Sequence, residues 1–437
     1  MKTYNGAVTI DTHNDTMLRV INKDTWLPVN NIGNLLSDTQ LDIPKMKEGG
    51  LNAAFFSSYT SGYTQPGRAG SRLLALINAL HWTERMNSDK FGLAMSANEI
   101  EKLTGEGKSV GVPTIEGAYS LEKYNAVELL EQYYDLGIRA VALCWSNSNS
   151  LGEGVNGKYV DGTLSKGGLT ELGIKVVEEM NKLGMIVDVS HMNEETFWGV
   201  VNVTKAPIMA SHSNAKGLYE HVRNLTDEQI VAIAKTNGVV QQNFYAGFLG
   251  PEGEQNLKKL VDHIDYVINL VGADHVGLGS DFDGGGMPED IPNASFYYRI
   301  KEELAKRGYE ESVIEKILGK NTLRVMREVQ SLSGRISDNA EKALTIIPDI
   351  EMGESVSSYA PLLKAKVSKY NCSNTDELSF RVIVDGIFYA PEFNADTGEL
   401  ILQINEPLIE KFHVVTFEGK AISGSVTRET RIFYIER

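Results

Sequence analysis

The feature that most constrains the fold is a repeated alternation of short apolar runs with longer segments of helical period. This alternation is typical of parallel strands joined by crossover helices, because strands buried on both faces read as continuous apolar stretches. Eight such runs precede residue 300, and they span residues 7–12, 52–59, 111–116, 138–145, 184–190, 206–212, 238–244 and 275–281.

Segments of helical period separate these runs, and most of them end near a glycine that can adopt a left-handed conformation. The clearest span residues 72–87, 126–136, 169–183, 226–235 and 257–271. Eight strand and helix units predict a TIM-like (β/α)8 barrel of the α/β class, whose usual length of about 250 residues is extended here by long loops. An open doubly wound sheet is the alternative, but it needs an early glycine fingerprint for phosphate that this chain lacks.

The sequence pattern changes near residue 330, where helical periodicity is replaced by strand-like alternation with frequent turn residues. The strand candidates span residues 378–384, 400–404, 412–417 and 430–435, and residues 394–398 read as a hairpin turn. An immunoglobulin-like sandwich is one form that fits about 90 residues of this kind. The predicted organisation is a barrel over residues 1–330, a connector over residues 331–348, and a small all-β, sandwich-like domain over residues 349–437.

Charge narrows the possible partners. The 437-residue chain has 42 Lys and Arg against 58 Asp and Glu, a formal net charge of -16 at pH 7. An acidic surface repels phosphate, so we expect no nucleic acid or membrane partner and favour a small solute. The two cysteines, Cys144 and Cys372, are far apart in sequence, which argues against a disulfide framework and a thiolate zinc site and favours a reducing compartment.

Location is predicted from apolar stretches. The N-terminal segment has no signal-peptide h-region, and no apolar stretch approaches the roughly 18 to 20 residues needed to cross a bilayer. We therefore expect a cytoplasmic protein, with assembly into a homo-oligomer left open.

The candidate chemistry begins where the first strand candidate ends. His13 and Asp15 stand two residues apart, so on a strand they project to the same side and can reach one metal ion over the barrel mouth. Alone this pair is weak evidence, because a polar strand end facing water has the same pattern. Three further strand ends strengthen the case for a metal site.

These ends carry Glu116, His191 and His212, all at the rim where barrel enzymes build their sites. A carboxylate such as that of Glu116 can bridge two ions about 3.5 to 4 Å apart. A single histidine at a strand end is more often structural, but four strand ends with potential metal ligands at one rim favour a two-metal site. Asp281, at the end of the last strand candidate, is a proton shuttle or a further metal support.

Nitrogen and oxygen ligands without thiolate suit Zn²⁺, which lowers the pKa of a bound water to about 7. We read Asp283 as a turn residue and the glycines at 284–286 as a flexible loop without chemistry. The sequence gives less support to a serine or cysteine nucleophile. No Gly-x-Ser-x-Gly elbow is present, and Cys144 lies inside a strand candidate, where a buried, inert thiol is the default.

The ordered motifs of residues 7–330 resemble those of the membrane (renal) dipeptidase family, which are zinc dipeptidases. They are His13-Asn14-Asp15, Ile115-Glu116-Gly117, Asp188-Val189-Ser190-His191, Ala210-Ser211-His212-Ser213-Asn214, Arg223-Asn224-Leu225-Thr226-Asp227 and Gly279-Ser280-Asp281-Phe282-Asp283-Gly284. The resemblance implies a distorted barrel of the metal-dependent hydrolase type that holds two zinc ions.

By position, the resemblance assigns His13 and Asp15 to the first ion, His191 and His212 to the second, and Glu116 to both. It places the substrate-binding arginine at Arg223 and the proton-transfer acid at Asp281.

The implied reaction is hydrolysis of a dipeptide by a hydroxide that bridges the two zinc ions. Asp281 would pass a proton to the leaving amine, and Arg223 would hold the terminal carboxylate through a bidentate pair. A surface salt bridge is the alternative reading of Arg223. The family also accepts a D-residue at the C-terminal position, and we expect the same here.

One departure concerns the end of the fourth strand, where the animal enzymes carry a histidine thought to bind the substrate carbonyl. The matching position here is Trp145, whose indole offers one N–H and no acceptor. Asn147 and Asn149 are candidates to supply the polar contact. Two rival functions stay open: an N-acyl amino acid hydrolase on the same metals, and a noncatalytic binding protein with a structural metal cluster.

Overall fold

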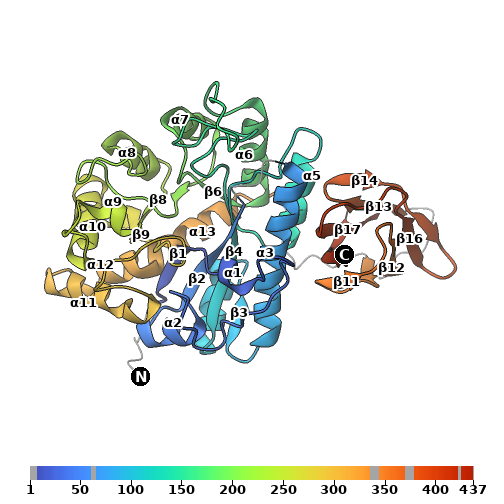
Figure 1. The fold of residues 1–437 in the computed structure, drawn as a ribbon, viewed down its shortest axis with the longest axis horizontal. Helices are drawn as coiled ribbons and strands as arrows, with labels where there is room; N and C mark the ends of the chain where they lie inside the picture. The colour runs from blue at the N-terminus through green and yellow to red at the C-terminus, as the bar shows by residue number, and fades with distance from the viewer. Residues whose placement is uncertain (1–6, 61–64, 335–343, 370–377, 422–424, 437) are drawn as a thin grey trace.

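The computed structural model describes residues 7–60, 65–334, 344–369, 378–421 and 425–436. Two parts share the chain, a barrel surrounded by helices and a pair of β-sheets formed by described residues between 344 and 435, here named the C-terminal sheets (Figure 1). Among the described residues, no helix combines the length and the apolar character needed to cross a membrane.

The barrel is a parallel sheet with the strand order β1-β2-β4-β5-β6-β7-β8-β9, and β3 pairs with β4 outside this path. The strands are β1 Ile10–Asn14, β2 Ala53–Tyr59, β3 Phe91–Leu93, β4 Ser109–Glu116, β5 Ala140–Ala142, β6 Ile186–Asp188, β7 Met209–Ala210, β8 Val239–Gln242 and β9 Val276–Leu278. Beyond β9, the Asp281 amide donates to the His13 carbonyl and the Asp15 amide to the Phe282 carbonyl, which nearly closes the barrel. The predicted TIM-like barrel is confirmed.

Helices follow most strands and cover the outside of the barrel (Figure 1). They are α1 Met17–Val20, α2 Ile43–Gly49, α3 Pro66–Met86, α4 Ala97–Gly105, α5 Ala126–Asp135, α6 Glu171–Leu183, α7 Glu194–Val203, α8 Asp227–Lys235, α9 Ala246–Leu249, α10 Leu257–Val271, α11 Tyr298–Lys306, α12 Glu311–Glu315 and α13 Asn321–Ser331. Capping residues in the sequence set where these helices begin and end. Thr226 begins α8 with a capping box, and Gly184 ends α6 with a left-handed φ of 74°.

Several boundaries differ from the sequence prediction. Strand β1 begins at Ile10 and includes His13, because its parallel pairing with β2 starts at Ile10 opposite Ala53. Strand β7 has only two residues, and β3 was not predicted because a three-residue run carries no clear period. Helix α3 begins at Pro66, six residues before the predicted start.

The C-terminal sheets form one four-stranded sheet, β10-β12-β16-β15, and one five-stranded sheet, β11-β18-β17-β13-β14. The strands are β10 Leu344–Pro348, β11 Glu354–Val356, β12 Leu362–Lys369, β13 Leu378–Val384, β14 Ile387–Tyr389, β15 Glu392–Asn394, β16 Glu399–Gln403, β17 Phe412–Ala421 and β18 Val426–Ile435. Side chains of both sheets share one apolar cluster, which includes Leu363, Leu400, Val382 and Phe417. The predicted all-β, sandwich-like character is confirmed.

The C-terminal end of the predicted connector contains a strand. Residues 344–348 form β10 because alternate side chains of this run enter the shared cluster while its backbone pairs with β12. Residues 335–343, in the middle of the predicted connector, lie outside the described residues. The division into domains at residues 330 and 349 stays a prediction.

Candidate active site

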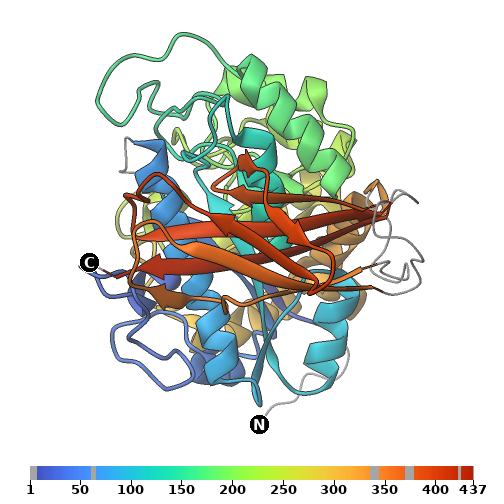
Figure 2. The same cartoon turned by 90° about the vertical axis from the view of Figure 1, so that its right-hand side faces the viewer.

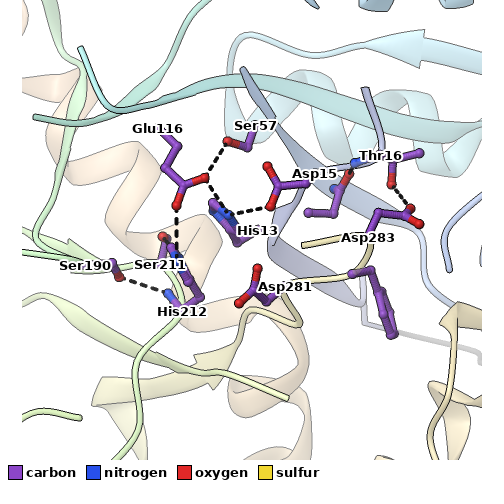
Figure 3. A network of polar contacts seen from close by, with 12 residues as sticks. His13, Asp15, Thr16, Ser57, Glu116, Ser190, Ser211, His212, Asp281 and Asp283 are labelled. Carbon is purple, nitrogen blue, oxygen red and sulfur yellow. Dashed lines mark hydrogen bonds and ion pairs between the residues drawn. The ribbon is translucent and has the colours of Figure 1, made fainter. Parts of the chain in front are cut away.

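Five side chains from four parts of the barrel meet at the carboxyl ends of the strands, and Figure 3 shows four of them, His13, Asp15, Glu116 and His212. His13 is the penultimate residue of β1, Asp15 directly follows this strand, and Glu116 is the last residue of β4. His191 and His212 follow β6 and β7 by a few residues. The chain brings them together because parallel strands of a barrel end at the same rim.

The distances show how Glu116 lies between the imidazoles. Its Oε2 is 3.4 Å from His13 Nε2, whereas its Oε1 is 2.8 Å from His191 Nε2 and 3.7 Å from His212 Nε2. On the other side, His13 Nε2 is 3.8 Å from Asp15 Oδ2. The two oxygens of one carboxylate therefore face two different groups of ligands, which is the arrangement that a bridging carboxylate needs.

The donor set fits divalent cations. His13 Nε2 and Asp15 Oδ1 are buried and have no hydrogen-bond partner. The Nε2 atoms of His191 and His212 lie 2.8 Å apart, so at most one of the two can donate to the other. Buried polar atoms of this kind are costly unless a ligand satisfies them. Nitrogen and oxygen donors without sulfur suit Zn²⁺ and similar ions.

Outer contacts orient two of the imidazoles. His191 Nδ1 lies 2.9 Å from Ser146 Oγ, and His212 Nδ1 lies 2.7 Å from Ser211 Oγ. Ser211 in turn donates to Asp188 Oδ2 at 2.5 Å. These contacts leave each Nε2 directed at the centre, as is usual for metal-ligating histidines. Sequence reasoning did not assign these residues, although Asp188 and Ser211 belong to its motifs.

Burial and mutual charge shift the pKa values of the cluster. Burial raises the pKa of Glu116 to about 7. Burial alone would lower the pKa of His13, but the Glu116 and Asp15 carboxylates outweigh it and hold that pKa well above 6.5. Burial lowers the pKa of His191 and His212 well below 6.5, and the positive charges of Arg223 and His13 add to this. Two neutral imidazoles beside buried acids are ready to bind a cation.

Unusual backbone conformations surround the cluster. His191 and Asp281 have left-handed φ values of 68° and 67°, a region that costs non-glycine residues about 1 to 2 kcal/mol. At Gly284 a Cβ would lie 2.3 Å from Asp15 Oδ2 and 2.4 Å from Asp281 Oδ1. The glycine run is therefore not only a flexible loop, because Gly284 lets the backbone approach two site carboxylates closely.

Asp281 lies at the same rim and faces the cluster (Figure 3). Its Oδ2 accepts a hydrogen bond of 3.0 Å from Asn243 Nδ2, and burial raises its pKa. Sequence reasoning missed Asn243; its only signal is its position directly after β8. Asp283 has the left-handed φ of a turn residue and also accepts a hydrogen bond from Thr16 Oγ1 at 2.7 Å, which ties this loop to the end of β1.

Arg223 is buried beside the imidazoles. Its guanidinium donates to the His212 carbonyl at 3.2 Å and to Ser213 Oγ at 3.4 Å, while its Nε has no partner. No carboxylate of the described residues lies within ion-pair distance of it, and burial lowers its pKa. A surface salt bridge is therefore not the role of this side chain. Arg223 and His191 both line a pocket of about 170 Å³.

Trp145 also lies at the site. Its ring centroid is 5.7 Å from that of His191 and 5.6 Å from that of Tyr59. The side chains of Asn147 and Asn149 bond within their own loop. Asn149 uses both its oxygen and its nitrogen there, so it does not replace the histidine of the animal enzymes.

A (β/α)8 barrel with imidazoles and carboxylates converging at its catalytic rim defines a metal-dependent hydrolase. Residues 3–340 match the sequence model of the membrane dipeptidase family (peptidase family M19), and the chain belongs to this family of metallodipeptidases. The C-terminal sheets lie beyond the matched residues.

Individual relatives agree with this assignment. Dipeptidase tcpJ of Claviceps purpurea is 30% identical over 309 residues, which cover 67% of this chain and 70% of that protein. An uncharacterized protein of Klebsiella pneumoniae, named for its place in the pqqA 5′ region, is 38% identical over 247 residues, 56% of this chain and 90% of its own. A metallopeptidase from Rhodobacter sphaeroides, solved with a phosphinate mimic of L-Ala-D-Ala, aligns with a TM-score of 0.66 at 28% identity, covering 74% of this chain and 100% of its own.

Proposed function

We propose that this metallodipeptidase cleaves dipeptides at a centre for two zinc ions. His13 and Asp15 would hold one ion, His191 and His212 the other, and Glu116 both. The observation that carries the proposal is the position of Glu116, whose two oxygens face His13 on one side and the other two imidazoles on the other. When bound, the ions would polarise the scissile carbonyl and supply a water with a pKa of about 7.

Arg223 binds the substrate's terminal carboxylate in this proposal. A buried guanidinium without a carboxylate partner is costly, and a substrate carboxylate would satisfy it through a strong bidentate pair. Its contact with the His212 carbonyl fixes the bound carboxylate at a short distance from the cluster. A site with this anchor favours substrates in which the scissile bond lies one residue from the C-terminus.

Asp281 and Glu116 are the proposed catalytic residues, Glu116 as the ligand of both ions and Asp281 as the acid. Burial raises the pKa of Asp281, so it can carry a proton at a pH where an exposed acid cannot. Asn243 holds Asp281 Oδ2 at 3.0 Å and directs the carboxyl group toward the cluster. We propose that Asp281 delivers the proton to the leaving amine.

The substrate class extends to dipeptides with a C-terminal D-residue. The Rhodobacter sphaeroides relative was solved with a mimic of L-Ala-D-Ala, which supports this proposal by similarity. Trp145 and Asn147 would contact the substrate, with the indole ring next to His191 as an apolar wall. A cytoplasmic location and a homo-oligomer stay predictions from the sequence.

A substrate panel tests the proposal. Zinc-loaded protein is given L-Ala-D-Ala, L-Ala-L-Ala and N-acetyl-alanine, and hydrolysis is measured for each. We expect cleavage of the two free dipeptides. Cleavage of the N-acetyl compound alone would identify the rival N-acyl amino acid hydrolase, and L-Ala-D-Ala left intact would remove the proposed D-specificity. The noncatalytic rival predicts that Asp281→Asn and Arg223→Ala leave function unchanged.

A further inference from the structure

The C-terminal sheets pack against barrel helices α3 and α5, and Figures 1 and 2 show them covering that side of the barrel. Side chains alternate along the two longest strands. Phe412 and Val414 of β17 and Ile432 of β18 belong to the apolar cluster of the barrel, whereas Phe417 and Phe433 belong to the cluster between the two sheets. The five-stranded sheet is therefore buried on both faces, which fixes its position on the barrel.

A polar contact on α5 strengthens this position. Gln132 is fully buried, and its amide nitrogen donates to the Ile383 carbonyl at 3.1 Å and to Thr416 Oγ1 at 2.9 Å. Its oxygen accepts from the Gly386 amide at 2.7 Å. One barrel side chain thus makes three hydrogen bonds to the C-terminal sheets.

At one end of this interface, the sheets contact the chain that follows β1 and α1. The chain after β1 forms a hairpin over residues 20–30, here named the rim hairpin, which starts five residues after Asp15. Lys411, just before β17, donates from its Nζ to the carbonyl oxygen of Asp24 in this hairpin. Beside it, Glu410 pairs with Arg68 of α3 at 3.4 Å.

Trp26 is the centre of this contact. Its ring lies 4.9 Å from Lys411 Nζ, and 4.3 and 5.2 Å from the guanidinium carbons of Arg68 and Arg72. Trp26 is buried and has a left-handed φ of 67°, an outlier for a bulky residue. Such a conformation persists only where the surroundings hold it, and here the Trp26 amide donates to the Asn22 carbonyl at 2.9 Å while three cations lie near the indole.

We propose that the C-terminal sheets brace the catalytic rim, with Lys411 and Trp26 as positioning residues. Lys411 holds the rim hairpin against α3, and the hairpin in turn restrains the chain that carries Asp15. The C-terminal sheets thereby act on substrate binding without contributing a group to the site. The effect on substrate binding rests on the proposed function, whereas the contact between Lys411 and the rim hairpin does not.

The test compares Lys411→Met, which removes the cation, with Lys411→Arg, which keeps it. Lys420→Met is the matched control, because Lys420 is an exposed lysine at the other end of β17. Hydrogen exchange of a peptide covering residues 20–30 is measured on the full-length, zinc-loaded protein, together with KM and kcat for L-Ala-D-Ala.

For Lys411→Met we expect about tenfold faster exchange in the rim hairpin and a KM raised about threefold or more, with metal content and kcat near those of the wild type. Lys411→Arg and Lys420→Met should behave as the wild type. Unchanged exchange in the hairpin of Lys411→Met would overturn the brace. So would an equal rise in exchange throughout the C-terminal sheets, because Lys411 would then only stabilise the fold. If the wild type fails to cleave dipeptides, the exchange result still decides the proposal.

Discussion

The catalytic rim and the interface with the C-terminal sheets both bury an arginine, but only the interface pairs its arginine with carboxylates. At the interface, Arg428 lies between three carboxylates, with Asp135 at 2.7 Å and both Glu131 and Glu418 at 2.8 Å. At the rim, Arg223 has no carboxylate of the described residues within ion-pair distance.

This difference distinguishes charged groups that stabilise the fold from charged groups that are available to bind a ligand. A buried ion costs several kcal/mol unless it is paired, so a fold that is selected only for stability would pair Arg223 as it pairs Arg428. The rim instead leaves three buried atoms without hydrogen-bond partners, Arg223 Nε, His13 Nε2 and Asp15 Oδ1. Cations and a substrate carboxylate would supply them, and four predictions test this contrast.

Replacement of a metal-ligand candidate gives the largest expected effect. His191→Ala should lower the bound metal from about two ions per chain and reduce kcat/KM by more than about a hundredfold, because the second ion loses a ligand. Mass spectrometry of metal content and a dipeptide assay check this. The control is His275→Ala, whose Nδ1 bonds the Gly238 carbonyl at the opposite end of the barrel. Full metal content in His191→Ala would contradict the site.

Loss of the unpaired guanidinium is the next effect. Arg223→Ala should raise KM for dipeptides by about 10 to 100-fold, since a hydrogen-bonded charge contributes about 1.5 to 3 kcal/mol. A dipeptide with an amidated C-terminus provides the control, because it offers no carboxylate. Wild type and variant should differ little with the amide, and an equal loss on both substrates would remove Arg223 from carboxylate binding.

The paired guanidinium should affect stability instead. Arg428→Ala should lower the free energy of unfolding by about 3 to 5 kcal/mol, because it removes the buried guanidinium that bonds Asp135, Glu131 and Glu418. Arg431→Ala, on the same strand, removes a half-buried side chain whose ion pair with Glu429 is 3.3 Å long, and it should cost about 1 kcal/mol or less. Denaturant unfolding measures both. Metal content should stay unchanged in folded Arg428→Ala, and a loss there would show that the two regions are not separate in function.

The smallest effect concerns pH and His413 in the C-terminal sheets. Burial alone would lower the pKa of His413, but the Asp385 carboxylate at 2.6 Å and the Glu410 carbonyl outweigh it and raise that pKa above 6.5. The protonated imidazole therefore stabilises the fold fully below pH 6.5, and this contribution is lost as the pH rises through the raised pKa.

Unfolding of the wild type and His413→Gln between pH 6 and 9 measures this contribution. The stability difference between the two proteins should shrink as the pH rises. A difference that grows with pH would show that His413 is neutral in the folded state.

Part of the site could be predicted from strand ends alone. His13, Glu116, His191 and His212 follow apolar runs, and parallel strands bring such ends to one rim. Asn243 and Ser146 could not be predicted as partners of Asp281 and His191, because amide and hydroxyl residues are common at strand ends and carry no local signal of their partner. The extent of β1 also depended on its partner strand, since pairing sets where a strand stops.

The sequence by itself determined the alternation of strands and helices and the residue types at the rim, because burial period and side-chain chemistry are local properties. Only the tertiary structure decided that Glu116 turns one oxygen to each group of imidazoles, that Arg223 is buried without a carboxylate partner, and that Lys411 reaches the rim hairpin. These facts depend on contacts between residues far apart in the chain. No local pattern encodes such contacts, since the packing of whole elements sets them.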